Sequence, residues 1–289
     1  MLAKRLAVIG LGLIGGSVAR SLRASGAVGS IVGFDPDARQ RTAAVELGVI
    51  DVAADSASSA VAEADLVIVA VPVLHTAEAF AAIAPALPAN CVVTDVGSTK
   101  QSVLADVRRV FGELPGWYVP GHPIAGTEKS GVANSLEGLF RKHRVILTPH
   151  AQQAPEALAK VRALWELCGA RVVEMEPSLH DEIFAATSHL PHLLAYSFVD
   201  TLAGIDRSGQ IFSNAGGGFR DFTRIASSSP QMWHDIVRAN AASVSTILAK
   251  QIAELQAMQA MIDGGRWDEL KTVFERARNA REHYLTQIE

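Results

Sequence analysis

Short runs of consecutive apolar residues recur along the first half of the chain. Gly, Pro, Asp or Asn bounds each run, and the runs cover residues 5–10, 30–35, 65–71, 90–96, 144–149 and 170–176. Uninterrupted Val and Ile runs of this length predict strands buried on both faces, as in a parallel sheet. Alanine-rich helical segments lie between them at 15–25, 37–47 and 75–86. This alternation predicts a doubly wound α/β domain with a mostly parallel sheet over residues 1–177.

The pattern changes after Pro177, because strand-like runs no longer occur. Apolar positions now follow helical spacing, which predicts helices at 178–202, 230–262 and 266–287 with Gly-containing breaks at 214–219 and 263–265. The apolar positions of the long helix, from Trp233 to Ile262, form a stripe longer than a small helical domain covers by itself. We therefore predict an all-helical dimerisation domain over residues 178–289, which pairs two subunits into a homodimer.

Composition supports a globular protein and argues against nucleic-acid binding. The chain has 289 residues, of which 49% are hydrophobic and 19% charged, enough for two domains with sizeable cores. The net charge is −4, and no run of Lys and Arg is longer than Lys4-Arg5, so no basic surface for nucleic acid is expected. Cys91 and Cys168 lie far apart without CxxC spacing and are expected to be small core residues in a reducing compartment.

The first residues resemble a signal peptide only in part. Two cations precede an apolar run, but Arg20 and Arg23 follow directly and no small-residue cleavage pattern fits. No stretch of 18 or more apolar residues occurs, so a membrane span is not expected. The sequence therefore predicts a cytoplasmic protein.

A glycine-rich turn follows the first predicted strand. "GLGLIGG" places glycines at 10, 12 and 15, and Asp35 ends the second predicted strand twenty positions after Gly15. This context, strand then helix then acid, is typical of a Rossmann-like domain that binds a dinucleotide. The carboxylate of Asp35 would accept hydrogen bonds from the adenosine ribose and repel a 2′-phosphate, which favours NAD over NADP. The predicted cofactor contacts in this region are Gly10, Gly12, Leu13, Ile14, Gly15 and Asp35.

Further candidate residues follow the other strands. Ligands bind outside the carboxyl ends of strands in an open α/β sheet. Val71 and Pro72 end one strand and would flank the nicotinamide, while Ser98 follows the next strand and should lie near the reactive end of the cofactor. His122 comes after the short strand-like piece "WYVPG", within the polar Gly- and Pro-containing loop 119–132, and should reach the same rim.

The helix predicted at 178–202 carries an unusual group of polar residues. Asp181, Ser188 and His192 are spaced to share one helix face, and His189 is displaced from it. Pro191 removes a backbone hydrogen bond and should kink the helix beside them. The two histidines could instead be hydrogen-bonded core residues. A metal site is not expected, because no third ligand with suitable spacing is evident.

Two arginines follow the later glycines. Arg220 and Arg224 are four residues apart after the glycine run 216–218. Either could be a solvated surface cation, and either guanidinium could bind a carboxylate through two hydrogen bonds.

Four segments in this order resemble a known family. The segments are "GLGLIGGS", "GHPIAGTEKSG", "HDEIFAATSHLPH" and "GGGFRDFTRIA" followed by "MW". Together they resemble the prephenate/arogenate (cyclohexadienyl) dehydrogenases of tyrosine biosynthesis. The resemblance covers nearly the whole chain, and the last three segments are more specific than the glycine pattern. It implies oxidative decarboxylation of prephenate or arogenate, in which hydride passes from C4 of the ring to NAD, the C1 carboxylate leaves as CO2 and the ring becomes aromatic.

The resemblance also implies roles for individual residues. His122 would bind the C4 hydroxyl and act as the base, Ser98 would orient His122 or the substrate, and Arg224 would bind a substrate carboxylate. His192, on the facing helix, is the competitor for the role of base. The other residues expected to line the substrate pocket are Thr127, Ser188, His189, His192 and Trp233, with Trp233 coming either from its own chain or from a partner subunit.

Two other functions are consistent with a Rossmann-like domain joined to a helical one. A β-hydroxyacid or imine dehydrogenase usually carries a Lys on the interdomain helix, but no Lys occurs between residues 161 and 249. A non-catalytic NAD-sensing protein would need Gly10, Gly12 and Asp35 but not the set of His122, Ser98 and Arg224. Adding prephenate separates these functions, because only the enzyme would form NADH.

Overall fold

The computed structural model describes residues 1–127, 129–206 and 209–288. Its internal contacts divide the chain into two compact units, Met1–Ala241 and Ala242–Glu289. The first unit therefore contains the α/β part together with the helices that follow it up to residue 241. Of the helices in the described residues, none has the length and apolar character needed to cross a membrane.

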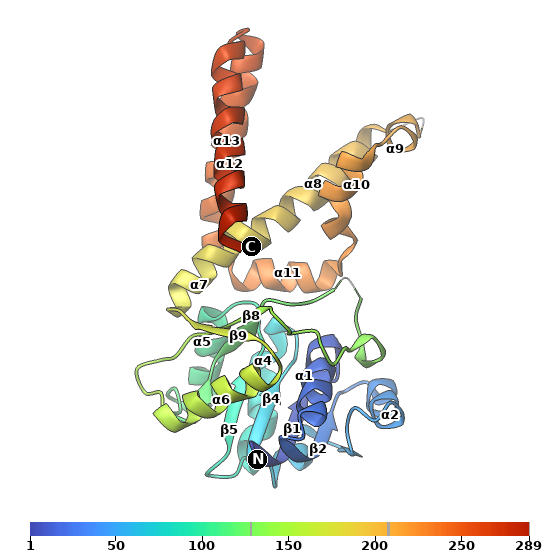
Figure 1. Cartoon of the computed structure of the whole chain (residues 1–289), viewed down its shortest axis with the longest axis vertical. Coiled ribbons are helices and arrows are strands. Elements are labelled where there is room, and N and C mark those ends of the chain that lie inside the picture. The colour runs from blue at the N-terminus through green and yellow to red at the C-terminus, as the bar shows by residue number, and fades with distance from the viewer. Residues whose placement is uncertain (128, 207–208, 289) are drawn as a thin grey trace. The chain divides into compact units, whose positions relative to one another are not determined.

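A six-stranded parallel sheet forms the centre of the first unit (Figure 1). Its strand order is β3-β2-β1-β4-β5-β6, with every neighbouring pair parallel, which confirms the predicted Rossmann-like, doubly wound arrangement. The strands are β1 (Ala3–Ile9), β2 (Val28–Phe34), β3 (Val52–Ala53), β4 (Leu66–Val69), β5 (Val92–Asp95) and β6 (Tyr118–Val119).

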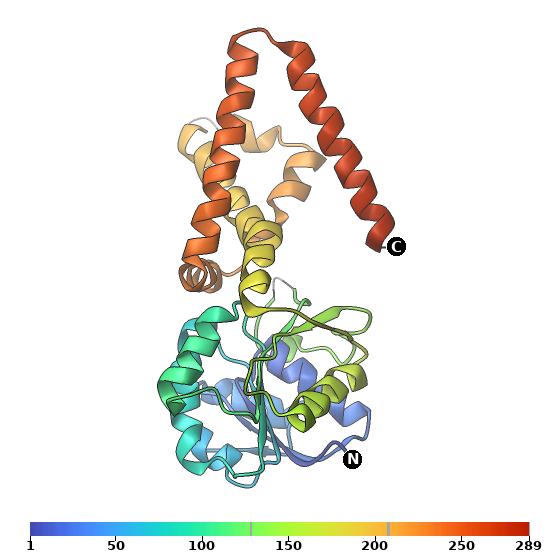
Figure 2. The same cartoon turned by 90° about the vertical axis from the view of Figure 1, so that its left-hand side faces the viewer.

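Helices cover both faces of this sheet (Figure 2). Alternate residues of β1 belong to two separate apolar clusters: Leu6 and Val8 pack with one, while Ala7 and Ile9 pack with the other. Burial on both faces explains why these strands are uninterrupted apolar runs in the sequence. The helices of this region are α1 (Leu13–Ala24), α2 (Ala38–Glu46), α3 (Ala57–Val61), α4 (Thr76–Ile83), α5 (Gln101–Phe111) and α6 (Pro155–Leu167), with short 3-10 turns at Val73–His75, Ala84–Ala86 and Val132–Asn134.

The last two predicted strands do not join the parallel sheet. β8 (Arg144–Leu147) and β9 (Arg171–Glu174) form a second, three-stranded sheet with β7 (Gly121–Pro123). β7 and β8 are antiparallel, whereas β8 and β9 are parallel. The sequence pattern was therefore correct about the strands but wrong about a single sheet. The residues of β9 are half-buried or exposed, so only β8 matches a strand buried on both faces.

The helix predicted at 178–202 contains an irregular turn. α7 (Pro177–Phe184) continues through a π-helical segment, Ala185–His189, into α8 (Leu190–Ile205). Pro191 lies in the first turn of α8, so its missing N–H coincides with the departure from regular α-helical bonding. The glycine-rich region is less of a break than predicted. α9 (Gln210–Ser213) ends before it, and α10 (Gly217–Thr223) begins inside it, followed by a 3-10 turn at Arg224–Ser227.

The long helix predicted at 230–262 is wrong as a single element. α11 (Pro230–Ala239) ends at Asn240, and α12 (Ala241–Asp263) starts after it. The buried side-chain amide of Asn240 donates to the carbonyl of Asp181 at 2.8 Å, so a tertiary hydrogen bond fixes the break. Trp233 and Ile236 of α11 pack into the core cluster that covers α3, α4 and α5. These two residues are therefore not available for the subunit interface that the apolar stripe suggested.

The second unit is a pair of helices. α12 and α13 (Trp267–Ile288) run in opposite directions from a turn at Gly264 and Gly265 (Figure 2). Gly265 has a φ of +63°, a conformation that favours glycine after a helix end. An ion pair of 3.3 Å between Arg276 and Glu254 joins the two helices.

Candidate active site

The turn between β1 and α1 has the geometry of a phosphate-binding loop. Gly10 has a φ of +99°, and a Cβ there would lie 2.3 Å from the carbonyl oxygen of Ala70. A Cβ at Gly15 would lie 2.1 Å from the carbonyl oxygen of Gly10, so this glycine permits close packing of helix on strand. At Gly12 a Cβ would meet nothing within 4 Å, and no side chain caps the N-terminus of α1. The loop therefore leaves open space in front of free N–H groups, which fits a pyrophosphate.

Asp35 lies beside this loop at the end of β2. One carboxylate oxygen accepts the N–H of Leu11 at 2.8 Å, and the other accepts the N–H of Asp37 at 2.9 Å. The guanidinium of Arg41 donates to the Asp35 carbonyl at 2.6 Å and lies 5.8 Å from the centre of the Phe34 ring. The carboxylate thus stabilises the loop and remains half-buried.

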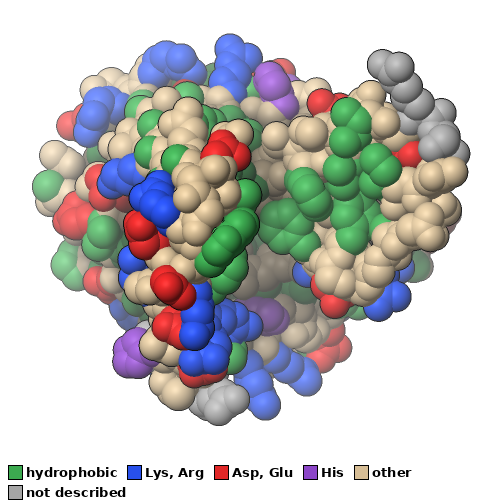
Figure 3. Space-filling view, turned by 90° about the horizontal axis from the view of Figure 1, so that it is seen from above, with side chains coloured by type: hydrophobic (Ala, Val, Ile, Leu, Met, Phe, Trp, Pro, Cys, Tyr) green, Lys and Arg blue, Asp and Glu red, His purple; other side chains and the backbone are tan. Residues whose placement is uncertain are grey.

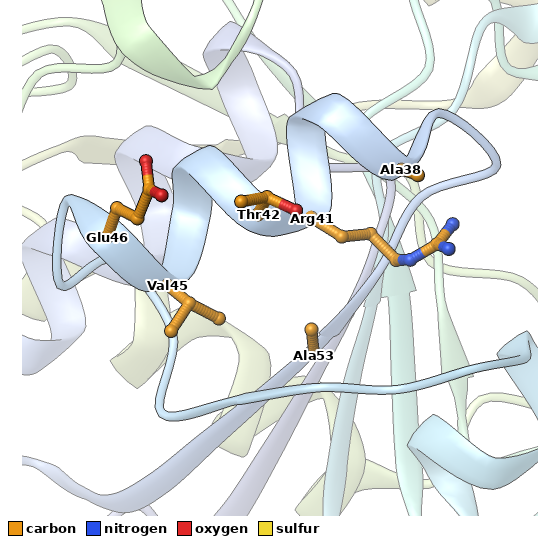
Figure 4. Close-up of a pocket in the computed structure, with 6 residues that line it drawn as sticks. All are labelled: Ala38, Arg41, Thr42, Val45, Glu46 and Ala53. Carbon is orange, nitrogen blue, oxygen red and sulfur yellow. The ribbon is translucent and has the colours of Figure 1, made fainter.

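A shallow open hollow lies next to this corner (Figure 4). Figure 4 shows Arg41 and Glu46 extending from α2 on its two sides. The hollow is lined by Ala38, Arg41, Thr42, Val45, Glu46 and Ala53. None of the predicted cofactor residues lines it, so it is distinct from the dinucleotide loop.

The ends of β4 and β5 carry the next predicted residues. Val71 and Pro72 follow β4, and Ser98 follows β5; Val71 and Ser98 are half-buried, while Pro72 is exposed. Because neighbouring parallel strands end at one edge of the sheet, both segments reach the rim that also holds the glycine loop.

A fully buried ion pair organises this rim. The ammonium of Lys100 lies 2.6 Å from a carboxylate oxygen of Asp95 and donates to the carbonyl of Gly121 at 2.5 Å. Asp95 also accepts the hydroxyl of Tyr118 at 2.8 Å and the N–H of Gly97 at 2.7 Å. Burial lowers the pKa of Lys100, and the charge of Asp95 opposes that decrease. These bonds attach the end of β5 to β7, the strand that carries His122.

His122 contacts a second histidine. Nδ1 of His122 lies 2.8 Å from Nε2 of His180, and Nδ1 of His180 lies 2.8 Å from Oδ1 of Asp181. The rings of both histidines pack on Phe184, with centroids 5.0 and 4.5 Å from its ring. Burial holds the pKa of His122 well below its usual value, and the neighbouring His180 and Lys100 add to the decrease. His122 is therefore neutral at pH 7, as a base must be.

The predicted pocket residues on the helices after Pro177 form a second group, separate from His122 and His180. The ring of His192 stacks on Trp233 of the same chain, with centroids 3.5 Å apart, and its Nδ1 bonds the Ser188 carbonyl at 2.8 Å. His189 lies 6.2 Å from the Trp233 ring and 3.3 Å from the side chain of Asn240. The ring stacking places Trp233 beside His192 of its own chain.

The predicted shared face of Asp181, Ser188 and His192 does not hold. Asp181 accepts the backbone N–H groups of Lys100 and Gln101 at 2.8 and 2.9 Å, while His192 turns to Trp233. The π-helical segment between Asp181 and His192 changes the angular spacing that a regular helix would have.

Two predicted substrate contacts are exposed. Arg224 is exposed, but its charge adds to the decrease that burial causes in the pKa of His192. Thr127 is also exposed, and its hydroxyl accepts the N–H of Lys129 at 3.2 Å. Glu128, in the same polar loop, lies outside the described residues.

Sequence reasoning missed His180, Lys100 and Asn240. His180 stands next to Asp181 in the "HD" pair of the helix, and that pair was the available signal. Lys100 is 0% exposed, although it follows a polar segment in the sequence. Nothing in the local pattern distinguishes it from a surface lysine.

Comparisons with known proteins bear on both halves of the chain. The family model described as "Prephenate dehydrogenase, nucleotide-binding domain" matches residues 18–174. A second model, "Prephenate dehydrogenase, dimerization domain", matches residues 176–276. The chain belongs to the prephenate dehydrogenase family. This confirms the resemblance inferred from the four sequence segments.

Individual members of the prephenate dehydrogenase family are similar over most of their length. The cyclohexadienyl dehydrogenase of Zymomonas mobilis is 38% identical over 283 residues, covering 96% of this chain and 95% of that protein. The prephenate dehydrogenase of Bacillus subtilis is 38% identical over 277 residues, covering 94% of this chain and 74% of that protein. A crystal structure of prephenate dehydrogenase from A. aeolicus with hydroxyphenyl propionate and NAD+ has a TM-score of 0.90 at 36% identity, covering 97% of this chain and 98% of that one.

Proposed function

We propose that this chain is an NAD-dependent dehydrogenase that decarboxylates prephenate, or a closely related cyclohexadienol, oxidatively in tyrosine biosynthesis. The observation that carries the proposal is His122, a neutral histidine at the rim of a Rossmann-like sheet whose Nδ1 is bonded to His180. The relatives named prephenate and cyclohexadienyl dehydrogenase, and the relative solved with NAD+, support the same activity. The two rival functions have no comparable support.

The chemistry needs one base and no net proton release. NAD held by the glycine loop would supply the acceptor for the hydride that leaves C4. His122 takes the proton of the C4 hydroxyl, so that a ring carbonyl forms at C4. The bond between C1 and its carboxylate then breaks, CO2 leaves, and the electron pair passes through the ring to the C4 oxygen. His122 returns its proton to that oxygen, which gives the phenol.

The remaining residues are proposed to bind and orient the reactants. NAD would be held by the glycine loop, Leu13, Ile14, Asp35, Val71 and Pro72. Ser98 would lie between cofactor and substrate. Arg224 would bind a substrate carboxylate. The other proposed pocket residues are Thr127, Ser188, His189, His192 and Trp233. Residues 1–177 and 178–289 remain the proposed nucleotide-binding and substrate-binding domains, and a cytoplasmic location remains a prediction.

The test of the function is NADH formation. Purified protein with NAD should increase absorbance at the NADH band when prephenate is added, and steady-state kinetics with prephenate and arogenate should identify the preferred substrate. The two substrates differ only in a keto or an amino group on the side chain. Saturable NAD binding without turnover of either substrate would contradict the proposal and support an NAD sensor.

We expect a clear preference for NAD over NADP in kcat/KM. The carboxylate of Asp35 stands beside the glycine loop, and a 2′-phosphate there would meet like charge at a cost of about 1–3 kcal/mol. Replacing Asp35 with Asn should narrow the preference while the amide oxygen still accepts the N–H of Leu11. Equal or better use of NADP by the wild-type protein would contradict this interpretation of Asp35. The control is Asp55→Asn, which removes the same negative charge at an exposed position and should leave the preference unchanged.

We also propose that the helical part joins two subunits into a homodimer. The family model for the dimerization domain supports dimerisation. Figure 3 shows hydrophobic side chains at the surface in groups between charged ones. In the second unit, the exposed large apolar residues are Ile252, Leu255, Ile262, Trp267, Phe274 and Tyr284. Exposed apolar area of this kind is typical of a subunit interface.

Light scattering at micromolar concentration should give twice the mass of one chain. Leu255→Glu places a charge at an exposed apolar position of α12 and should raise the dimer dissociation constant by about tenfold or more. Gln256→Glu adds the same charge at the neighbouring polar position and should change it little. A wild-type protein that is monomeric under these conditions would rule the dimer out.

A further inference from the structure

Three buried or half-buried side chains form a continuous hydrogen-bonded row in the candidate active site. His122 lies on β7, and both His180 and Asp181 lie on α7. The two links in the row, His122 Nδ1 to His180 Nε2 and His180 Nδ1 to Asp181 Oδ1, are both 2.8 Å. His180 is 0% exposed and Asp181 is 1% exposed, so water does not compete for these bonds.

The row allows only one arrangement of protons. An ionised carboxylate can only accept, so the proton between Asp181 and His180 belongs to Nδ1 of His180. In a neutral imidazole the other nitrogen then carries a lone pair, so Nε2 of His180 is an acceptor. The proton between the two histidines therefore belongs to Nδ1 of His122, and Nε2 of His122 keeps its lone pair.

Asp181 is fixed at the far end of the row. Its two carboxylate oxygens accept the N–H groups of Lys100 and Gln101 at the N-terminus of α5, which has no side-chain cap of its own. Its carbonyl accepts the side chain of Asn240. Burial opposes ionisation, but the hydrogen bonds from His180 and from the two backbone groups hold the pKa of Asp181 below its usual value. Burial also lowers the pKa of His180, with Asp181 opposing, so His180 is neutral.

We propose that His180 and Asp181 are positioning residues that hold His122 in the tautomer whose Nε2 accepts the substrate hydroxyl proton. The inference rests on the proposed function, in which His122 is the base. The two residues do not touch the reacting atoms. They act by presenting His180 Nε2 as the acceptor for His122 Nδ1–H.

The row also compensates the charge that His122 carries during turnover. When His122 holds the hydroxyl proton, its Nδ1–H bond to His180 becomes charge-assisted and therefore stronger. The other charged or titratable groups that face His122 are Lys100, from the segment before α5, and His189, from the π-helical segment. Lys100 is already paired with Asp95 at 2.6 Å, and burial lowers the pKa of His189 to about 4, so Asp181, acting through His180, is left to compensate the charge that His122 gains.

The first experiment compares His180→Phe with His180→Gln by steady-state kinetics. Phe keeps a ring against Phe184 but removes the acceptor, so kcat should fall about 10- to 100-fold with the KM of substrate nearly unchanged. Gln supplies an oxygen that can accept from His122, so it should recover part of the loss. The control is His234→Gln, because His234 forms a similar pair with Asp235 at 2.9 Å but its ring is exposed. The control should keep wild-type kcat.

The pH profile separates positioning from a structural role. The loss of a charge-assisted bond destabilises protonated His122, so the acidic limb of kcat should persist in His180→Phe but move to lower pH. NAD titration and thermal melting establish that each variant is folded. Where His180→Phe does not fold, His180→Gln decides, with a smaller shift of the acidic limb to lower pH expected because its amide oxygen is a weaker acceptor than the His180–Asp181 pair. Wild-type kcat with an unmoved limb in a folded variant would overturn the proposal, as would a loss confined to KM.

A double-mutant cycle distinguishes failure of the row from failure of the proposed base. In the His122→Asn background, adding His180→Phe should change kcat less than twofold, because the residue it positions is already absent. An equal loss in both backgrounds would show that His180 acts independently of His122 and would overturn the proposal. If His122→Asn alone retains wild-type kcat, the assignment of the base fails instead.

Discussion

His122→Asn should lower kcat by about 10²–10⁴, the usual contribution of a positioned acid–base group, and change the KM of substrate little. Asn can still bind a hydroxyl but cannot take its proton at neutral pH. His122 is suited to the role because it lies at the strand rim and because burial keeps its ring neutral. Initial-rate kinetics of NADH formation at saturating NAD measure both parameters.

The pH dependence of kcat gives a second measure of the same residue. Activity requires neutral His122 and should fall as the pH decreases through the pKa of this group. Since burial depresses that pKa, the acidic limb of the wild-type profile should lie below pH ~6.5, the ordinary value for histidine. The limb should be absent in His122→Asn.

A surface histidine provides the control for this prediction. His143 precedes β8 and is exposed, so His143→Asn should leave kcat and the acidic limb as they are in the wild type. Near-normal kcat in His122→Asn, or an unchanged acidic limb, would move the role of base to His192 or to water. The stacking of His192 on Trp233 and its bond to Ser188 favour a positioning role for it instead.

Local pattern identified the longer strands, but it missed the short strands β3 and β7 and did not give the assembly of the strands into sheets. The runs at 144–149 and 170–176 have the Val and Ile content of buried strands, and both are strands in the structure. Which sheet they join depends on β7, a strand of three residues that carries Gly121, His122 and Pro123 and has no apolar signal of its own. Its antiparallel pairing with β8 is a tertiary contact, and residue type along the chain does not encode it directly.

The break at Asn240 illustrates the same limit in a helix. Apolar residues at helical spacing continue from Ile236 to Val244, so the local signal predicts one helix. The side chain of Asn240 instead bonds the carbonyl of Asp181, about sixty residues earlier in the chain. An Asn in a helical pattern does not reveal whether its amide faces solvent or a distant carbonyl.

Some residues of the candidate site can be found from local sequence, whereas others can be found only from tertiary contacts. His122 and Ser98 could be found because each follows a strand in a polar, Gly-containing segment, where ligand sites of α/β proteins gather. His180, Asp181 and Lys100 work through contacts with one another across the fold, at sequence separations of up to 81 residues. Lys100 is buried against Asp95, and the carboxylate of Asp181 on α7 caps the N-terminus of α5. Both arrangements can be recognised only when the elements are assembled.

Arg224→Ala should weaken substrate binding by about 2–5 kcal/mol, seen mostly as a KM raised about 30- to 4,000-fold, with the affinity for NAD nearly unchanged. A guanidinium binds a carboxylate through two hydrogen bonds, and prephenate carries two carboxylates. The structure favours Arg224 over Arg220 for this role. Both arginines are exposed, but the charge of Arg224 contributes to the lowered pKa of His192, whereas Arg220 lies 3.7 Å from Asp221.

Three variants make the assignment of the arginine decisive. Arg224→Lys keeps the charge but loses the planar pair of donors, so its KM should lie between those of the wild type and Arg224→Ala. Arg220→Ala is the matched control and should keep a KM within about twofold of the wild type, because surface ion pairs contribute little. A wild-type KM in Arg224→Ala together with a raised KM in Arg220→Ala would assign the carboxylate to Arg220.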